Sequence, residues 1–326
     1  MDVSFEQMYQ QVSEKYRPQL EEMGKSIGRK LWIARALSIV VIVLIIWLLG
    51  GLALYIVLVP IAAFFSYKQT LKRPYVLFFR ENVARSFVAL VDSSLLYSPE
   101  PSASEWGRIL EKYHTAQFEG IGMVPVNGVR GSPGLSNAIT GEIEGHPFQL
   151  CCMSLQGSGG KNDKRKFKGL FVSMKVSKPL NGFIKTERKT NLLLGSGIRF
   201  IPRGERKKMD SAAFMKDFFV GSNDQVTAMR YLTADVMELM INFKNELMDI
   251  QRRFNRDILP QNPHAISLDF FWHGNEVLMR IGNKKMFKPT LRNPMCKDSL
   301  ACCLATLTFA TKLNHVITKS IKETSI

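Results

Sequence analysis

The clearest pattern along the chain is an uncharged apolar block near the N-terminus. No charged residue occurs between Ala36 and Phe65. As one helix this stretch would be about 45 Å long, well above a hydrocarbon thickness of about 30 Å. Gly50 and Gly51 interrupt it, and glycine tolerates the left-handed backbone angles of a tight turn. The block therefore predicts a transmembrane helical hairpin over residues 31–67 with its turn at 50–51.

Basic residues flank this block on both sides. They are Lys15, Arg17, Lys25, Arg29, Lys30 and Arg35 at its start, and Lys68, Lys72, Arg73, Arg80 and Arg85 after it. Positive residues next to membrane segments stay in the cytoplasm, so a hairpin keeps both flanks inside, whereas a single span would export one of them. The alternative is one long tilted helix with Gly50-Gly51 as a packing notch. We favour the hairpin, with both termini cytoplasmic.

Amphipathic patterns lie on either side of the predicted hairpin. Residues 1–30 predict an N-terminal helix whose apolar positions recur at spacings of three and four; these are Phe5, Met8, Tyr9, Val12, Tyr16, Leu20, Met23 and Ile27. Residues 68–94 predict a connecting helix with a second apolar stripe, formed by Val76, Phe79, Val83, Phe87 and Leu90. The two stripes either pack together as a stalk or lie separately against the rest of the protein.

Residues 95–326 predict an α+β domain. Short apolar or alternating runs bounded by glycine are typical of strands, and they occur at 138–155, 166–176 and 181–186. The segment AISLDFFWHGNEVLMRIG, residues 265–282, predicts a β-hairpin with its turn at His273-Gly274-Asn275. Helical spacing returns in two later segments, residues 224–254 and 296–319. Strands followed by helices predict a cytoplasmic antiparallel sheet covered by helices.

These elements resemble a bacterial family catalogued as domain of unknown function 3137. The resemblance rests on LLYSP at 95–99, TGEIEGHPFQL at 140–150, FKGLFVSMKV at 167–176, VTAMRYLTADVMELM at 226–240, SLDFFWHGNEVLMRI at 267–281 and MFKP at 286–289. It implies a basic N-terminal segment, a membrane hairpin, a connecting helix and an α+β cytoplasmic domain. It implies no established activity. Genes of the family often lie near those of LemA-type membrane proteins, which implies a role in the bacterial envelope.

The positive charge of the chain is concentrated in one region. The net charge is +16, and fifteen Lys and Arg residues between positions 161 and 208 are opposed by only three acidic residues. Many of them fall in predicted loops that can meet at one end of a sheet. The candidate residues for binding an anionic surface are Lys161, Lys164, Arg165, Lys166, Lys168, Arg188, Lys189, Arg203, Arg206, Lys207 and Lys208.

Three kinds of partner suit such a basic region. An anionic lipid surface is favoured, because the domain is predicted to be tethered beside one and each nearby basic residue contributes about 1 kcal/mol. A protein partner in the envelope is the second choice. Nucleic acid is unlikely, since the basic loops contain few aromatic residues for base stacking and no nucleic-acid-binding motif. The apolar stripe of residues 1–30 leaves a homo-oligomer open.

Catalytic motifs are not evident. The sequence around Lys161 resembles a phosphate-binding loop, but Leu155 occupies the first glycine position and Asn162 replaces the Ser or Thr that would hold magnesium. The five cysteines form no C-x-x-C pair, which argues against a zinc site and against a disulfide framework and fits a reducing compartment. We therefore expect no catalytic residues, no metal and no cofactor.

The sequence thus favours a membrane-anchored binding or scaffold protein of the bacterial inner membrane. One alternative is a membrane-surface enzyme that acts on lipid or envelope precursors, and a deep pocket lined by His146, Asp269 or Glu276 would favour it. Another is a secreted effector that inserts its hairpin into a host membrane. A membrane hairpin serves both locations, so the sequence does not separate the two.

Overall fold

A computed structural model describes residues 4–49, 57–102, 104, 107, 134–155, 167–189, 206–254, 266–282 and 286–324. The predicted turn at Gly50-Gly51 lies outside these residues. The chain forms two compact units. The first contains residues 1–87 and 287–297, and the second contains residues 88–286 and 298–326. The backbone therefore passes between the units three times.

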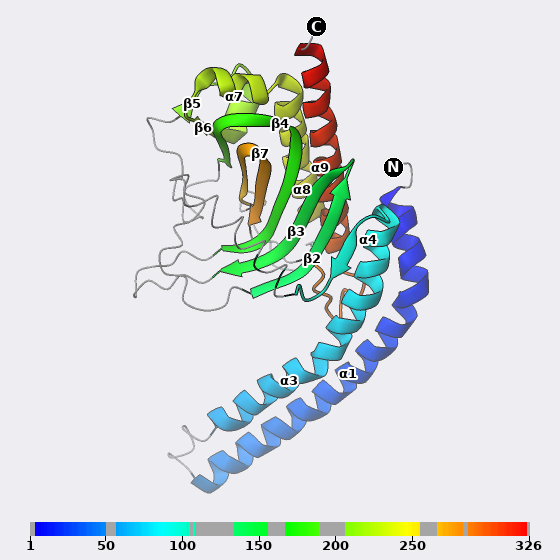
Figure 1. The fold of residues 1–326 in the computed structure, drawn as a ribbon. Coiled ribbons are helices and arrows are strands. Elements are labelled where there is room, and N and C mark those ends of the chain that lie inside the picture. Colours follow the sequence, from blue (N-terminus) through cyan, green and yellow to red (C-terminus); the bar gives the residue numbers. More distant parts are fainter. Residues whose placement is uncertain are drawn as a thin grey trace. The chain divides into compact units, whose positions relative to one another are not determined.

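The first unit is built on two long helical segments. Helix α1, Phe5–Leu49, is one continuous helix of 45 residues that includes the amphipathic N-terminal stretch and the first predicted span. Helix α3, Leu58–Phe78, continues through a π-helical segment, Phe79–Ala84, into α4, Arg85–Val91. Figure 1 shows α1 and α3 side by side, and residues of the two helices are in contact.

The two apolar stripes that flank the hairpin pack against each other. The ring of Phe5 lies 6.2 Å from that of Phe87, and the ring of Tyr16 lies 6.4 Å from that of Phe78. The hydroxyl of Tyr16 is also 3.0 Å from Ser86 Oγ. The buried stripe residues are Met8, Val12, Leu20, Ile27, Phe79, Val83 and Phe87. The stalk arrangement, one of the two predicted alternatives, is confirmed.

A short segment that lies far away in the sequence completes this unit. Residues 287–297 pack against the helices. Tyr75 donates a hydrogen bond from its hydroxyl to the carbonyl oxygen of Thr290, at 3.2 Å. Lys297 Nζ lies 2.8 Å from Glu6 Oε2. The segment therefore connects both helical stretches to the part of the chain that follows the sheet.

The second unit contains an antiparallel sheet, and seven of its strands lie in the described residues. The strands are β1 (Leu96–Ser98), β2 (Gly134–Ile143), β3 (His146–Leu155), β4 (Phe167–Arg188), β5 (Arg206–Lys207), β6 (Phe218–Ser222) and β7 (Leu268–Gly282). Their order is β1-β2-β3-β4-β6-β5, and β7 pairs with β4 outside this path. The predicted α+β class is confirmed.

Strand β4 organises the sheet. It is a single strand of 22 residues, although the sequence predicted two short strands here. The strand curves strongly (Figure 1), and its pairing with β7 is irregular between Lys175 and Phe183. Strand β3 pairs with its first part and β6 with its last part, while β7 runs along its other edge.

The predicted β-hairpin at 265–282 is wrong. Both halves of β7 pair with β4, on either side of Gly274. Gly274 has a φ of +57°, a left-handed value that glycine adopts without steric cost. The glycine therefore bends one strand, because each half of β7 finds its hydrogen-bond partner in the curved β4 and not in the other half.

Helices cover one face of the sheet. They are α6 (Ala212–Asp217), α7 (Gln225–Tyr231), α8 (Ala234–Phe254) and α9 (Lys297–Thr324). The ring of Phe309 on α9 lies 4.3 Å from Phe243 on α8 and 5.4 Å from Phe270 on β7. Helix α9 is long and apolar enough to cross a membrane, but 67% of its most apolar stretch is buried inside the structure. These contacts identify α9 as a core helix of the second unit.

Candidate membrane-facing surfaces

Helices α1 and α3 carry an unusual band of exposed apolar side chains. Sixteen of the twenty exposed large apolar side chains in the described residues lie between Trp32 and Tyr67. Trp47 is 80% exposed and Leu48 is 68% exposed. We call this set the apolar band. Contiguous exposed apolar surface of this extent marks a membrane or protein contact. Helix α1 is long and apolar enough to cross a membrane, and its most apolar stretch is not buried inside the structure.

Two hydroxyl groups, one in the apolar band and one just beyond it, are bonded within their own helix. Ser38 Oγ donates to the carbonyl oxygen of Ala34 at 2.8 Å. Near the end of the band, Thr70 Oγ1 donates to the carbonyl oxygen of Ser66 at 3.2 Å. Such internal bonds satisfy hydroxyl groups without water, which is a requirement inside a hydrocarbon layer. The band is therefore compatible with lipid at its polar positions as well as its apolar ones.

Part of the predicted surface lies outside the described residues. These residues are Gly50, Gly51, Lys161, Lys164, Arg165, Lys166 and Arg203. Lys168 lies in β4, where its backbone is paired with Ser154 of β3. The remaining predicted residues, Arg188, Lys189, Arg206, Lys207 and Lys208, are described, and the structure places them in different environments.

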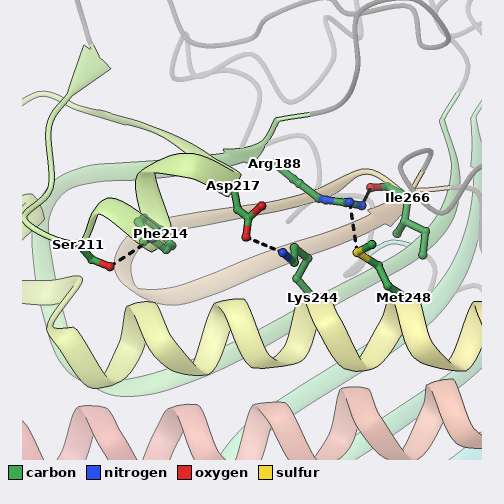
Figure 2. A network of polar contacts seen from close by, with 7 residues as sticks. All are labelled: Arg188, Ser211, Phe214, Asp217, Lys244, Met248 and Ile266. Atoms are coloured by element: carbon green, nitrogen blue, oxygen red, sulfur yellow. Dashed lines mark hydrogen bonds and ion pairs between the residues drawn. The ribbon is translucent and has the colours of Figure 1, made fainter.

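Arg188 is a buried residue. It is 6% exposed, its Nη1 donates to the carbonyl oxygen of Ile266 at 2.7 Å, and its Nη2 lies 3.4 Å from the sulfur of Met248 (Figure 2). Burial lowers the pKa of Arg188, and the charge of Asp217 acts in the opposite direction. The guanidinium group is therefore engaged inside the domain and does not belong to an exposed binding surface.

The neighbouring polar contacts in Figure 2 hold the surrounding elements together. Asp217, at the end of α6, forms an ion pair with Lys244 of α8, with Oδ2 and Nζ 2.5 Å apart. Ser211 caps α6, because its Oγ accepts a hydrogen bond from the backbone N–H of Phe214 at 3.2 Å. The network has the character of a structural joint between α6, α8 and the end of β4.

Lys189 and Arg206 share an aromatic partner. Lys189 Nζ and Arg206 Cζ each lie 4.6 Å from the ring centroid of Phe219. Lys189 also donates from Nζ to the carbonyl oxygen of Met215. Both cations are half-buried. These contacts anchor the two side chains on β6, so their charges lie at the edge of the domain with limited freedom to move.

Lys207 and Lys208 lie beside the short helix α7. Gln225 Nε2 donates to the carbonyl oxygen of Lys208 at 2.6 Å. Asp224 caps α7 by accepting bonds from two backbone N–H groups. A hydrogen bond from the Thr227 side chain, these backbone bonds and the charge of Lys207 lower the pKa of Asp224. Lys208 is exposed and Lys207 is half-exposed. Of the described predicted residues, these two are the most accessible to an external partner.

Helix α7 presents two apolar residues that the sequence analysis missed. Val226 is 63% exposed and Met229 is 40% exposed, although Ala228 and Tyr231 of the same helix are buried. The sequence signal was their spacing of three residues, which places them on one face of a helix. That spacing is equally typical of a core face, so only the structure distinguishes the two cases.

The three residues considered for a catalytic pocket are engaged at separate places. Asp269 is buried in an ion pair with Arg280. Glu276 accepts a hydrogen bond from Ser173 Oγ at 2.6 Å. His146 Nε2 lies 3.0 Å from Ser177 Oγ.

The cysteines are free thiols, and four of them are buried. Burial raises the pKa of Cys151 and of Cys303, which makes both thiols poor nucleophiles near neutral pH. Among the described residues, no three His, Cys, Asp or Glu side chains are arranged to hold a metal ion.

No curated protein matches the chain. Among solved structures, the mycobacterial trehalose monomycolate transport factor A, TtfA, matches with a TM-score of 0.32 and 9% identity, over 69% of this chain and 94% of that chain. Residues 165–317, a segment that ends in the last third of α9, match the family described as protein of unknown function (DUF3137). Over this segment, the match supports the DUF3137 family that the strand and helix motifs resemble.

Proposed function

We propose that this protein is a membrane-anchored binding or scaffold protein whose α+β domain is held on an anionic membrane surface. The apolar band on α1 and α3 is the observation that carries the proposal. Its exposed side chains are unfavourable in water and favourable in lipid, where about 25 cal/mol is gained for each square ångström removed from water. Anchoring, and not catalysis, is the property that this band supplies.

The band has the dimensions of a membrane segment. From Trp32 to Leu49, α1 extends over about 27 Å, which matches the hydrocarbon layer of about 30 Å. Helix α3 resumes at Leu58 beside α1. Basic residues lie just beyond the apolar band on both helices, including Arg29 and Lys72. The positive-inside rule then supports a hairpin whose two ends face the cytoplasm of a bacterial cell.

Cysteine labelling in intact cells tests this topology. Gln11 on α1 and Asn245 on α8 are exposed, so Gln11→Cys and Asn245→Cys each introduce one accessible thiol, and Gly51→Cys introduces one at the predicted turn. The unsubstituted protein measures background from the native cysteines. We expect a membrane-impermeant maleimide to label only position 51 before lysis and all three positions after it. Labelling of position 245 but not 11 in intact cells would show a single span with the domain outside.

Energy transfer to lipid headgroups tests the surface contact. Full-length protein carrying a dye at position 245 is reconstituted into vesicles with acceptor-labelled headgroups. We expect greater transfer when the vesicles contain phosphatidylglycerol than when they are neutral. Replacement of Lys164, Arg165 and Lys166 by glutamine should reduce the difference. Equal transfer in both lipids would contradict binding to an anionic surface and would leave an envelope protein as the partner.

A further inference from the structure

We infer that α7 is a second, peripheral lipid contact, in which Val226 and Met229 enter an anionic bilayer interface while neighbouring basic residues bind phosphate headgroups. This inference rests on the proposed membrane anchor and deepens it, because it names the part of the domain that touches lipid. Its basis is that apolar and basic side chains accessible to a partner lie together on α7 and directly beside it.

The apolar part of the contact is local and well defined. In the described part of the second unit, the exposed large apolar residues are Leu90, Leu96, Val226 and Met229. The last two lie within seven residues of helix, three positions apart, and therefore point in nearly the same direction. Leu90 lies on α4 and Leu96 on β1, so neither is part of this face.

The basic part of the contact adjoins the same face. Arg230 follows Met229 on α7 and is exposed. Lys207 and Lys208 are held beside the start of α7 by the hydrogen bond from Gln225 to the Lys208 carbonyl. Figure 1 shows β5, β6 and α7 grouped at one corner of the domain. The acidic residues nearest in sequence to these groups are Asp210, which is exposed, and Asp224, whose carboxylate accepts bonds from two backbone N–H groups of α7.

Charge complementarity favours anionic lipid as the partner of the exposed α7 face. A protein groove would accept the two apolar side chains, but a cationic rim around a shallow apolar face is typical of segments that bind anionic membranes. The short helix is rigidly mounted, because Tyr231 donates a hydrogen bond from its hydroxyl to the carbonyl oxygen of Pro179 on β4. Val226 and Met229 are therefore presented by a fixed element and need no refolding to meet a membrane.

Spin-label accessibility in the full-length protein tests the inference. Val226→Cys and Met229→Cys carry nitroxide labels, and Asn245→Cys on the exposed side of α8 is the matched control. The protein is reconstituted into phosphatidylcholine vesicles with or without phosphatidylglycerol. We expect labels at 226 and 229 to become more accessible to oxygen than to a nickel chelate in the anionic vesicles only. The label at 245 should stay aqueous in both.

A charge variant and an anchor label separate the outcomes. The triple substitution Lys207→Gln, Lys208→Gln and Arg230→Gln should return the labels at 226 and 229 to aqueous values. Aqueous values in anionic vesicles, with a label at Leu44 inside the bilayer, would overturn the α7 contact and leave the anchor intact. An aqueous label at Leu44 would overturn the anchor and the contact together. Immobilised labels at 226 and 229 without oxygen access would assign the face to a protein partner and overturn the inference.

Discussion

Asp269 and Arg280 lie on the same strand, eleven residues apart, and form a buried ion pair with Nε of the arginine 2.9 Å from Oδ2 of the aspartate. Along a straight strand, eleven residues would separate them by about 36 Å. The ion pair forms because β7 bends at Gly274, which brings the two ends of the strand together. Both side chains are 5% exposed.

Replacing one charged member of this pair should lower the free energy of unfolding more than replacing both. Arg280→Met leaves a buried, unpaired carboxylate, and we expect it to lower the free energy of unfolding by about 3–5 kcal/mol. The double variant Asp269→Leu, Arg280→Met replaces both charges by apolar groups and should recover most of the loss. Denaturant titration of the detergent-solubilised protein measures both. Equal destabilisation of the single and double variants would contradict this account of the pair.

Arg188 and the pair Lys207, Lys208 should respond to substitution in opposite ways. Because the Arg188 guanidinium is buried and bonded to the Ile266 carbonyl, Arg188→Gln should cost about 1.5–3 kcal/mol of stability. The double variant Lys207→Gln, Lys208→Gln should alter stability by less than about 0.5 kcal/mol, as is usual for surface positions. The same denaturant titration, paired with the headgroup energy-transfer assay, distinguishes them. If Arg188 instead acted at the surface, Arg188→Gln would lower energy transfer to the headgroups and leave stability unchanged.

Gly169 should be intolerant of any side chain. A Cβ at this position would lie 2.0 Å from the carbonyl oxygen of Ile281, in the backbone of the paired strand β7. Gly169→Ala must therefore separate β4 from β7, and we expect a loss of about 3 kcal/mol or more, comparable to a severe packing defect. Gly28→Ala is the control.

The control substitution lies in a helix with free space. No atom lies within 4 Å of a Cβ built at Gly28 of α1. Alanine there should be neutral or stabilise by up to about 1 kcal/mol, because it lowers the entropy lost on helix formation. Thermal unfolding followed by circular dichroism compares the two variants. A Gly169→Ala protein as stable as Gly28→Ala would show that the β4–β7 contact is looser than described.

Tyr75 should make the stalk sensitive to alkaline pH. Burial raises the pKa of Tyr75 to about 12, from an ordinary value of 10.0. Below pH 10 the hydroxyl is protonated in both the folded and unfolded states, so it contributes no pH dependence. Between pH 10 and about 12 only the unfolded state ionises, and stability should fall as the pH rises.

Substitution by phenylalanine isolates this effect. Tyr75→Phe loses the hydrogen bond to the Thr290 carbonyl, which should cost about 1 kcal/mol at neutral pH. Its melting temperature should then fall less steeply than that of the unsubstituted protein as the pH is raised through 10 and 11. Parallel pH profiles for the two proteins would show that Tyr75 ionises normally in the folded state.

Local pattern was sufficient for the long helices and for the candidate membrane span. The apolar positions from Phe5 to Ile27 predicted the buried stripe of α1, because a helical period of 3.6 residues fixes which side chains share a face. The uncharged run after Arg35 predicted a membrane span, since length and hydropathy are properties of the sequence itself. The motifs within residues 165–317 likewise indicated the family whose model matches this segment.

Tertiary structure decided which side chains are available. Arg188 and Lys208 look alike in a charge count, yet one is buried against Ile266 and the other is exposed, because burial depends on which strands and helices cover a position. Gly274 suggested a turn, but long-range pairing with β4 made it a bend within one strand. The sequence alone determined the long helices, the α+β class and the apolar run of α1. Contacts between residues far apart in the chain decided which charges and which apolar faces can meet a partner.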